Sequence, residues 1–431
     1  MVSATLLQND RQHVETERRS ALVARILESD VLFGDLTTGL PSEIHEDLRR
    51  SLQIELRSLS WSAQAYTEAK QGNCEALFGV AGADLGGKLI AARICRGLSQ
   101  KDLARKLGLK EQAIQRWEAD KYRSITIGNF QSVCSALEMT VGIVPLADER
   151  VKWSPIFETT QSEASRVLRH AKKRKWIADN DEERVLIKRI GDHVRTHGTP
   201  SLLRTGLNAK FQVPDWYLIA WKAQVTWLAE QRAGKLQYAY DPLDLEWLTK
   251  VGKLSQFADG PLRVQAFLET KGIVFIVEPP ISGMGVDGAA FLIEGVPVIG
   301  MTLLKDTVDN FWFTLLHELA HIVLHYRVGL TSGFFDDMEM RNVDDLEAQA
   351  DRFASNILVP EEIWRRSPAR IAKTVEPVNK LARELGIAPE IIFGRIRKER
   401  SNYRLFSRNI GQGKIRNLFS EFEGVKDSDI S

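Results

Sequence analysis

The segment FTLLHELAHIVLHY, residues 313–326, constrains the fold of this chain most strongly. It carries three of the eight histidines within nine residues, at His317, His321 and His325. The apolar residues between them predict a helix whose other faces are buried, which keeps the surroundings of the histidines low in dielectric. These apolar residues are Leu315, Leu316, Leu319, Ile322, Val323 and Leu324.

The spacing His-Glu-x-x-His over residues 317–321 predicts a metal site. Because side chains four residues apart share one face of a helix, His317 and His321 can present two imidazole nitrogens to a single Zn²⁺ ion. Glu318 then lies beside the open coordination position and can accept a proton from bound water. We therefore predict His317 and His321 as zinc ligands and Glu318 as the catalytic general base.

A third protein ligand is required if the fourth coordination position is to hold water. His325 lies too far along the same straight helix to close a tetrahedron around the ion, so we expect it at the rim of the site or in the core. Glu347, in LEAQADRFASNILVP on the next apolar-patterned helix, is the better candidate. Asp351 follows Glu347 by one helical turn and can accept the second ring N–H of His317 or His321. This spacing resembles the gluzincin arrangement of thermolysin-like metallopeptidases.

Residues 99–118, SQKDLARKLGLKEQAIQRWE, predict two short helices joined by a turn at Gly108. Ser99 can cap the first helix, while Ile114 and Trp117 form the inner face of the second. This is helix-turn-helix geometry, which lets the second helix enter the major groove of DNA. The polar side chains available for bases and phosphates are Gln100, Lys110, Glu111, Gln112, Gln115 and Arg116.

The distribution of charge agrees with a local nucleic-acid surface. The whole chain has 58 Lys plus Arg against 57 Asp plus Glu, so its net charge of +1 indicates no anionic partner by itself. Between Lys88 and Arg123, however, ten basic residues stand against four acidic ones, an excess of six positive charges. A second basic run, RVLRHAKKRK over 166–175, is more typical of a solvated helix face.

The pattern along the chain predicts a mainly α protein with one α+β zincin-like domain. A helical hairpin over 1–80 is either a dimerisation element or merely packs on its neighbour. A five-helix helix-turn-helix domain spans 81–145, and a helical connector spans 146–255. The zinc-binding core over 256–365 places three β-rich runs ahead of its key helices, and a helical extension spans 366–431.

Two family resemblances follow from these motifs. Residues 84–140 resemble the Cro/cI-like (XRE) helix-turn-helix, with L-S-Q, L-A-x-K-L-G and I-x-R-W-E in order. Lys110 departs from that pattern, which usually has a small capping residue there. Residues 256–419 resemble the ImmA/IrrE-type zinc metallopeptidase domain through FLETKGIVFIVEPP, DNFWFTLLHELAH and EAQADRFASNILVP. The combination is similar to regulators grouped with HigA-like antitoxins.

These resemblances imply a sequence-specific regulator of transcription that binds a double-stranded DNA operator as a homodimer and cleaves or senses a protein partner. The roles carried over are zinc ligation by His317, His321 and Glu347 and general-base catalysis by Glu318. In the alternative, the chain is an antitoxin-like repressor whose zinc domain binds a cognate toxin without cutting it. A zinc enzyme acting on a small molecule is a third hypothesis. Glu318 favours the peptidase, because a structural zinc site has no need of a base.

The sequence also bears on compartment and redox chemistry. Residues 1–20 contain no apolar signal core, and Asp287 and Glu294 interrupt the longest apolar stretch, so we expect a cytoplasmic protein without membrane contact. The three cysteines, Cys74, Cys95 and Cys134, lie far apart and lack C-x-x-C spacing. We therefore expect neither a disulfide scaffold nor cysteine-bound zinc.

Overall fold

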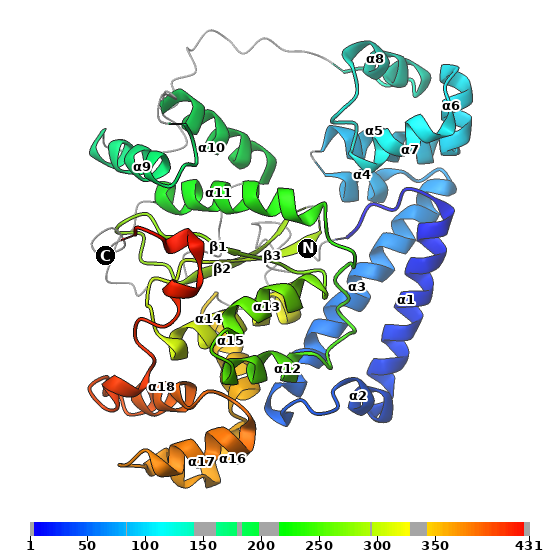
Figure 1. The fold of residues 1–431 in the computed structure, drawn as a ribbon. Helices are drawn as coiled ribbons and strands as arrows, with labels where there is room; N and C mark the ends of the chain where they lie inside the picture. Colours follow the sequence, from blue (N-terminus) through cyan, green and yellow to red (C-terminus); the bar gives the residue numbers. More distant parts are fainter. Residues whose placement is uncertain are drawn as a thin grey trace. The chain divides into compact units, whose positions relative to one another are not determined.

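The computed structural model describes residues 4–82, 84–141, 161–178, 183–197, 215–293, 295–327 and 343–425. Contacts divide the chain into two compact units (Figure 1). The N-terminal unit combines Val2–Phe33 with Leu52–Lys152, and the C-terminal unit combines Gly34–Ser51 with Trp153–Ser431. The boundary between the units crosses α2 (Asp30–Leu36) and α3 (His45–Lys70).

The described residues of the N-terminal unit form helices joined by loops and turns, and none of them forms a strand. Helix α1 (Asp10–Glu28) lies along the part of α3 that belongs to this unit, where the Tyr66 hydroxyl donates to Asp10 at 2.9 Å and Arg19 pairs with Glu55. The predicted helical hairpin therefore forms. The helices that follow are α4 (Glu75–Ala81), α5 (Leu85–Cys95), α6 (Gln100–Leu107), α7 (Glu111–Ala119) and α8 (Ile127–Ala136).

Local sequence explains how α6 and α7 become a helix-turn-helix. The Ser99 hydroxyl accepts the backbone N–H of Asp102, and the Asp102 carboxylate accepts the N–H of Ser99, which together form a capping box. Gly108 ends α6 in the left-handed conformation, at a φ of 67° that glycine adopts without strain. Ile114 and Trp117 are buried in the core of this unit, as their spacing predicted.

A three-stranded sheet lies at the centre of the C-terminal unit. Its strands are β1 (Val274–Val277), β2 (Gly288–Ile293) and β3 (Val296–Met301), in the spatial order β1-β3-β2. Strand β1 pairs with β3 in parallel, with Val274 opposite Val298, whereas β2 pairs with β3 antiparallel. Helix α11 (Asp215–Ala233) covers one face, and α13 (Gly260–Glu269) and α14 (Val308–His325) lie on the other (Figure 1).

Other helices of the C-terminal unit enclose α14. Helix α15 (Val343–Leu358) packs along it, and α18 (Pro389–Glu399) contacts it as well. Residues 34–51 add polar contacts to this unit. Asp47 accepts from Arg352 at 2.8 Å, and the Ser51 hydroxyl donates to the Val323 carbonyl at 3.0 Å. Glu43 accepts from the Glu362 N–H at 3.0 Å. The remaining helices are α9 (Gln161–Lys173), α10 (Glu183–His197), α12 (Leu248–Lys253), α16 (Glu361–Arg366) and α17 (Glu376–Leu385).

The architecture confirms the predicted fold class, a mainly α chain with one small α+β domain. The three β-rich runs form the three strands, and the apolar segment with the histidines forms α14, which is buried over most of its length. None of the described helices is both long enough and apolar enough to span a membrane.

The cysteines depart from the expectation drawn from their spacing. Cys74 and Cys95 form one disulfide, with their Cα atoms 5.8 Å apart, while Cys134 is a buried free thiol. Cys74 precedes α4 and Cys95 ends α5, and these two helices pack together. Sequence separation did not reveal the pair, because tertiary packing of two helices creates the proximity.

Candidate functional site

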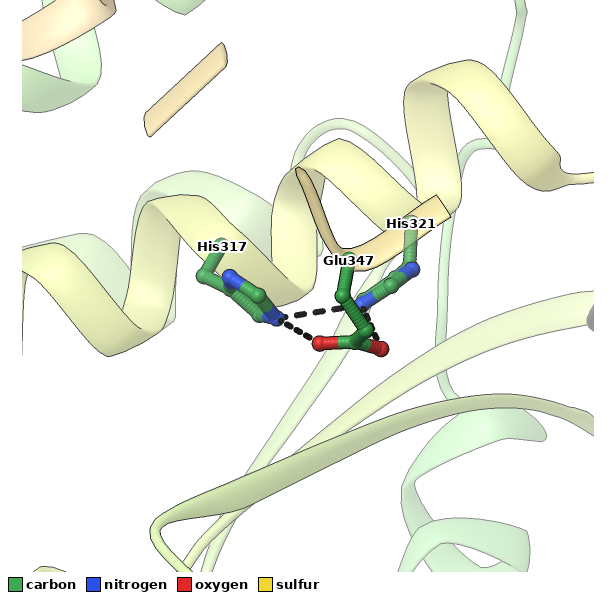
Figure 2. A group of neighbouring side chains, drawn as sticks. All are labelled: His317, His321 and Glu347. Atoms are coloured by element: carbon green, nitrogen blue, oxygen red, sulfur yellow. Dashed lines mark hydrogen bonds and ion pairs between the residues drawn. The ribbon is translucent and has the colours of Figure 1, made fainter. Parts of the chain in front are cut away.

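The three predicted metal ligands converge in the C-terminal unit. The Nε2 atoms of His317 and His321 lie 3.2 Å apart. The Glu347 carboxylate faces both rings, with Oε2 at 3.1 Å from His317 Nε2 and Oε1 at 3.4 Å from His321 Nε2. One donor atom from each residue lies within 4.8 Å of the others, and Figure 2 shows the three side chains directed toward one another.

Two packed helices create this convergence. His317 and His321 lie one turn apart on α14 and therefore share a face. Glu347 lies in the N-terminal half of α15, the helix packed against that face. Ala350 and Phe353 of α15 are fully buried and hold the register of the helix pair.

Each liganding imidazole also has a neighbour at its second nitrogen. His317 Nδ1 lies 3.0 Å from Asp351 Oδ1, and the Lys398 ammonium donates to the other oxygen of Asp351 at 2.9 Å. His321 Nδ1 lies 3.1 Å from Nδ1 of His325. His325 is buried, only 4% exposed, and takes no part in the three-atom cluster. The two candidate ligand rings are thus held from behind by different chemical groups.

Burial and charge shift the pKa values in this cluster. Burial lowers the pKa of His317, but hydrogen bonds to Asp351 and Glu347 outweigh it and raise the pKa to about 10. Burial raises the pKa of the Glu318 carboxyl, against the opposing charge of the neighbouring histidines. Burial also acts to raise the pKa of Asp351, yet hydrogen bonds from His317 and Lys398 keep it below its usual value. The carboxylates of Asp351 and Glu347 therefore favour the protonated, positively charged form of His317.

Glu318 neighbours the candidate metal ligands and lines a cavity of about 560 Å³. The start of β2 approaches its carboxylate so closely that a Cβ added at Gly288 would lie 3.1 Å from Glu318 Oε1. The lining combines charged and apolar side chains, among them Asp287, Lys305 and Phe313. The cavity is thus lined by two of the candidate ligands, His317 and Glu347, together with Glu318 and apolar side chains.

The donor set fits Zn²⁺. Two imidazole nitrogens and one carboxylate are the ligands of many catalytic zinc sites, which keep a fourth position for water or substrate. Zinc-ligating histidines generally direct their second nitrogen at a carboxylate, a carbonyl or another polar group, as His317 does toward Asp351. The chain thus has a His/Glu site of suitable chemistry for this ion.

Five of the six candidate DNA-facing residues lie on α7 and at its start. Glu111, Gln112, Gln115 and Arg116 are exposed on α7, where the Gln115 amide donates to Glu111 at 3.1 Å. Lys110 is exposed and occupies the N-cap position, but its side chain makes no capping hydrogen bond. This face therefore presents donors, acceptors and positive charge to solvent.

Gln100 lies in a different environment from the other candidate DNA-facing residues. It is half-buried, and its side-chain amide donates to Glu118 Oε2 at 2.8 Å. Glu118 is fully buried and pairs with Arg93. The amide of Gln100 is thus tied to the interior of the unit, and its contact with a phosphate stays a prediction.

The sequence analysis assigned no role to three residues close to the candidate metal ligands. Lys398 of α18 donates to Asp351, and the absence of a side chain at Gly288 leaves room for the Glu318 carboxylate next to β2. Gln349 contacts His325 from α15. Of the three, only Gly288 had a local signal, since a glycine at the start of a strand often marks a close approach of another group.

Comparison with known families agrees with both resemblances. Residues 270–397 match the M78 peptidase family, described as the IrrE N-terminal-like domain, and residues 89–143 match a helix-turn-helix family. No curated protein and no solved structure gives a significant match. The first match covers the sheet together with α14 and α15, and the second covers α6 to α8. The chain therefore combines an XRE-type helix-turn-helix domain with an IrrE N-terminal-like peptidase domain.

Proposed function

We propose that the chain is a DNA-binding regulator of transcription whose C-terminal unit is a zinc-dependent peptidase acting on a protein partner. The observation that carries the proposal is the convergence of His317, His321 and Glu347 next to Glu318. Three of these residues, His317, Glu318 and Glu347, line a single cavity. The two family matches support the pairing of DNA binding with a peptidase-like domain.

Each group of residues in the site has its own role in peptide hydrolysis. A Zn²⁺ ion held by His317, His321 and Glu347 would supply Lewis-acid activation of water and of the peptide carbonyl. Glu318 accepts a proton from the attacking water and passes it to the leaving amine, a role favoured by the burial that raises its pKa. Asp351 accepts the Nδ1–H of His317, which leaves Nε2 free to bind the ion.

The helix-turn-helix supplies the DNA-binding half of the proposal. Helix α7 would enter the major groove, where Arg116 can bind guanine and Gln112 or Gln115 can bind adenine. Glu111 can accept from cytosine, and Lys110 would contact a phosphate. Gln100 would contact a phosphate only after its amide leaves Glu118. We propose a homodimer on two half-sites about one helical turn apart, which is the usual geometry of this motif.

Replacement of Glu318 by glutamine tests the peptidase. The Glu318→Gln variant keeps the three ligands, so it should retain one zinc per chain and unchanged DNA affinity. It cannot accept the proton, so cleavage of a proteome-derived peptide library, read by mass spectrometry, should fall about 10² to 10⁴-fold. Glu362→Gln, an exposed carboxyl on α16 outside the cavity lining, is the matched control and should cleave normally.

The same variants separate the alternative function. Suppose that the wild-type protein binds zinc, that neither it nor Glu318→Gln cleaves peptides, and that both regulate a reporter operator identically. The proposal of peptidase activity is then wrong. The C-terminal unit is then a zinc-stabilised module that binds a partner such as a toxin, within an antitoxin-like repressor.

Replacement of Arg116 tests the DNA-binding face. Arg116→Ala should weaken operator binding by about 1 to 3 kcal/mol and relax the preference at one base pair, if this side chain contacts a base. Arg25→Ala, an exposed arginine on α1, is the control for lost charge. An equal loss on every DNA sequence would assign Arg116 to a phosphate instead.

A further inference from the structure

We propose that His325 and Gln349 are positioning residues that fix the tautomer of His321 and thereby direct its Nε2 lone pair at the metal. The inference rests on the zinc site of the proposed function and deepens it. It starts from a chain of polar contacts that runs from His321 through His325 to Gln349, which we call the relay. The relay ends at a neutral amide and contains no carboxylate.

The relay consists of two contacts between buried side chains. Gln349 Oε1 lies 3.1 Å from His325 Nε2, and His325 Nδ1 lies 3.1 Å from His321 Nδ1. The three residues are 8%, 4% and 7% exposed, in the order Gln349, His325 and His321. Their polar atoms must therefore satisfy one another, because leaving a buried donor or acceptor unpaired costs about 1 to 3 kcal/mol.

The order of donors follows from the number of protons. A neutral imidazole has one N–H donor and one acceptor nitrogen. Because Gln349 Oε1 can only accept, His325 must carry its proton on Nε2 and keep Nδ1 as an acceptor. His325 Nδ1 can accept only if His321 donates from its own Nδ1. His321 Nε2 is then unprotonated and faces His317 and Glu347 across the cluster.

Reversal of the Gln349 amide would produce the wrong tautomer. An NH₂ group directed at His325 would donate to Nε2 and leave the proton of His325 on Nδ1. That proton would face His321 Nδ1, so His321 would have to accept there and carry its own proton on Nε2. Such a ring cannot bind a metal through Nε2. The amide orientation of Gln349 is therefore coupled to the ability of His321 to act as a ligand.

The two ligand rings thus differ in how they are oriented. His317 faces the Asp351 carboxylate, which Lys398 partly neutralises. His321 faces a neutral relay through a second ring. One helix, α15, provides the ligand Glu347 together with Gln349 and Asp351, the end groups behind the two histidines. The packing of α15 on α14 therefore sets both the ligand position and both tautomers.

The test uses the full chain and four variants. His325→Phe keeps a ring but removes the acceptor, and Gln349→Leu removes the terminal oxygen. Gln349→Glu keeps an acceptor oxygen for His325 Nε2. Asn356→Leu removes a buried amide from the same helix, where it bonds the Arg352 carbonyl outside the cluster, and serves as the control. Zinc dissociation constants come from competition with a chromogenic chelator, and thermal unfolding of the chelator-treated proteins reports folding.

The expected outcome is a selective loss of zinc affinity. His325→Phe and Gln349→Leu should bind zinc 10 to 100-fold more weakly, whereas Gln349→Glu and Asn356→Leu should stay within about threefold of wild type. Nitrogen-15 NMR of histidine-labelled, metal-free protein should show His321 protonated on Nδ1 and His325 protonated on Nε2.

Two results would overturn the relay. One is wild-type zinc affinity in both His325→Phe and Gln349→Leu, and the other is a His325 proton on Nδ1. A wild-type chain that binds no zinc would refute the zinc site of the proposed function. The tautomers measured without metal still test the relay in that case, so the two failures are distinguishable.

Discussion

Arg93 and Glu118 form a buried ion pair inside the N-terminal unit, with Arg93 Nη2 2.8 Å from Glu118 Oε2. Their side chains are 3% and 0% exposed. The remaining donors and acceptors are also used, since Arg93 donates to the Gln8 and Leu98 carbonyls and Gln100 donates to Glu118. The pair joins α5 to α7 and so fixes the helix that carries the candidate DNA-facing residues.

Removal of one partner should loosen this unit. Glu118→Ala leaves the Arg93 charge buried without its counter-ion, which costs about 3 to 5 kcal/mol. Hydrogen exchange of backbone amides in α5 to α7, read by mass spectrometry, should therefore accelerate more than about a hundredfold. Glu111→Ala on the exposed face of the same helix should change exchange little. Equal protection in both variants would contradict the structural role of the pair.

The second nitrogen of His317 yields a prediction about metal affinity. Asp351→Ala removes the acceptor 3.0 Å from His317 Nδ1 and should weaken zinc binding about 10 to 100-fold. Asp345→Ala, an exposed acid on the same helix, controls for the loss of one negative charge. Chelator competition measures both variants, and similar losses in the two would indicate a general electrostatic effect without orientation of the ring.

The motifs that predicted this site are those set by helix periodicity. His317, Glu318 and His321 follow from residues one turn apart, and the need for a third ligand favoured Glu347 on the next apolar helix. Their convergence depended only on α15 packing against α14. The same periodicity predicted the buried face of α7 through Ile114 and Trp117.

The rest of the site depends on packing that no local pattern encodes. Lys398 reaches Asp351 from α18, and the Cys74–Cys95 bond depends on how α4 meets α5. Gln100 occupies a position typical of a phosphate contact, yet its amide is half-buried against Glu118. Such contacts depend on side-chain direction across two elements, which a single sequence does not specify.

The glycine opposite Glu318 predicts a variant that separates catalysis from metal binding. Gly288→Val would place a Cβ 3.1 Å from both Glu318 Oε1 and the backbone oxygen of Gly300. The Glu318 side chain moves more easily than the paired strand, so we expect the carboxylate to be displaced. Since a displacement of about 1 Å at a catalytic group can cost on the order of 10²-fold, peptide cleavage should fall by that factor while zinc content stays at one per chain. Gly234→Val, at an exposed position with open space around it, should cleave normally. Full activity of Gly288→Val would show that Glu318 needs no exact placement beside β2.

The buried carboxyl of Glu278, directly after β1, predicts a pH dependence of stability. Glu278 follows β1 and is 4% exposed, and it accepts from the Trp176 indole at 3.1 Å. Burial raises its pKa to about 7, and the nearby Arg174 opposes the shift only in part. Because the unfolded chain releases this proton near pH 4.5 and the folded chain keeps it, the stability contributed by Glu278 falls as pH rises from about 4.5 to 7.

Replacement of Glu278 by glutamine isolates this effect. Glu278→Gln keeps the acceptor for Trp176 but has no carboxyl to ionise, and all other titrating groups are common to both proteins. The stability of wild type relative to the variant should therefore fall by about 3 kcal/mol between pH 4.5 and pH 7.5 and stay level above that. Urea unfolding followed by tryptophan fluorescence at several pH values measures the difference. Glu246→Gln, which changes an exposed carboxyl, should give a much smaller slope. A constant difference between wild type and Glu278→Gln across this range would mean that Glu278 is ionised in the folded chain.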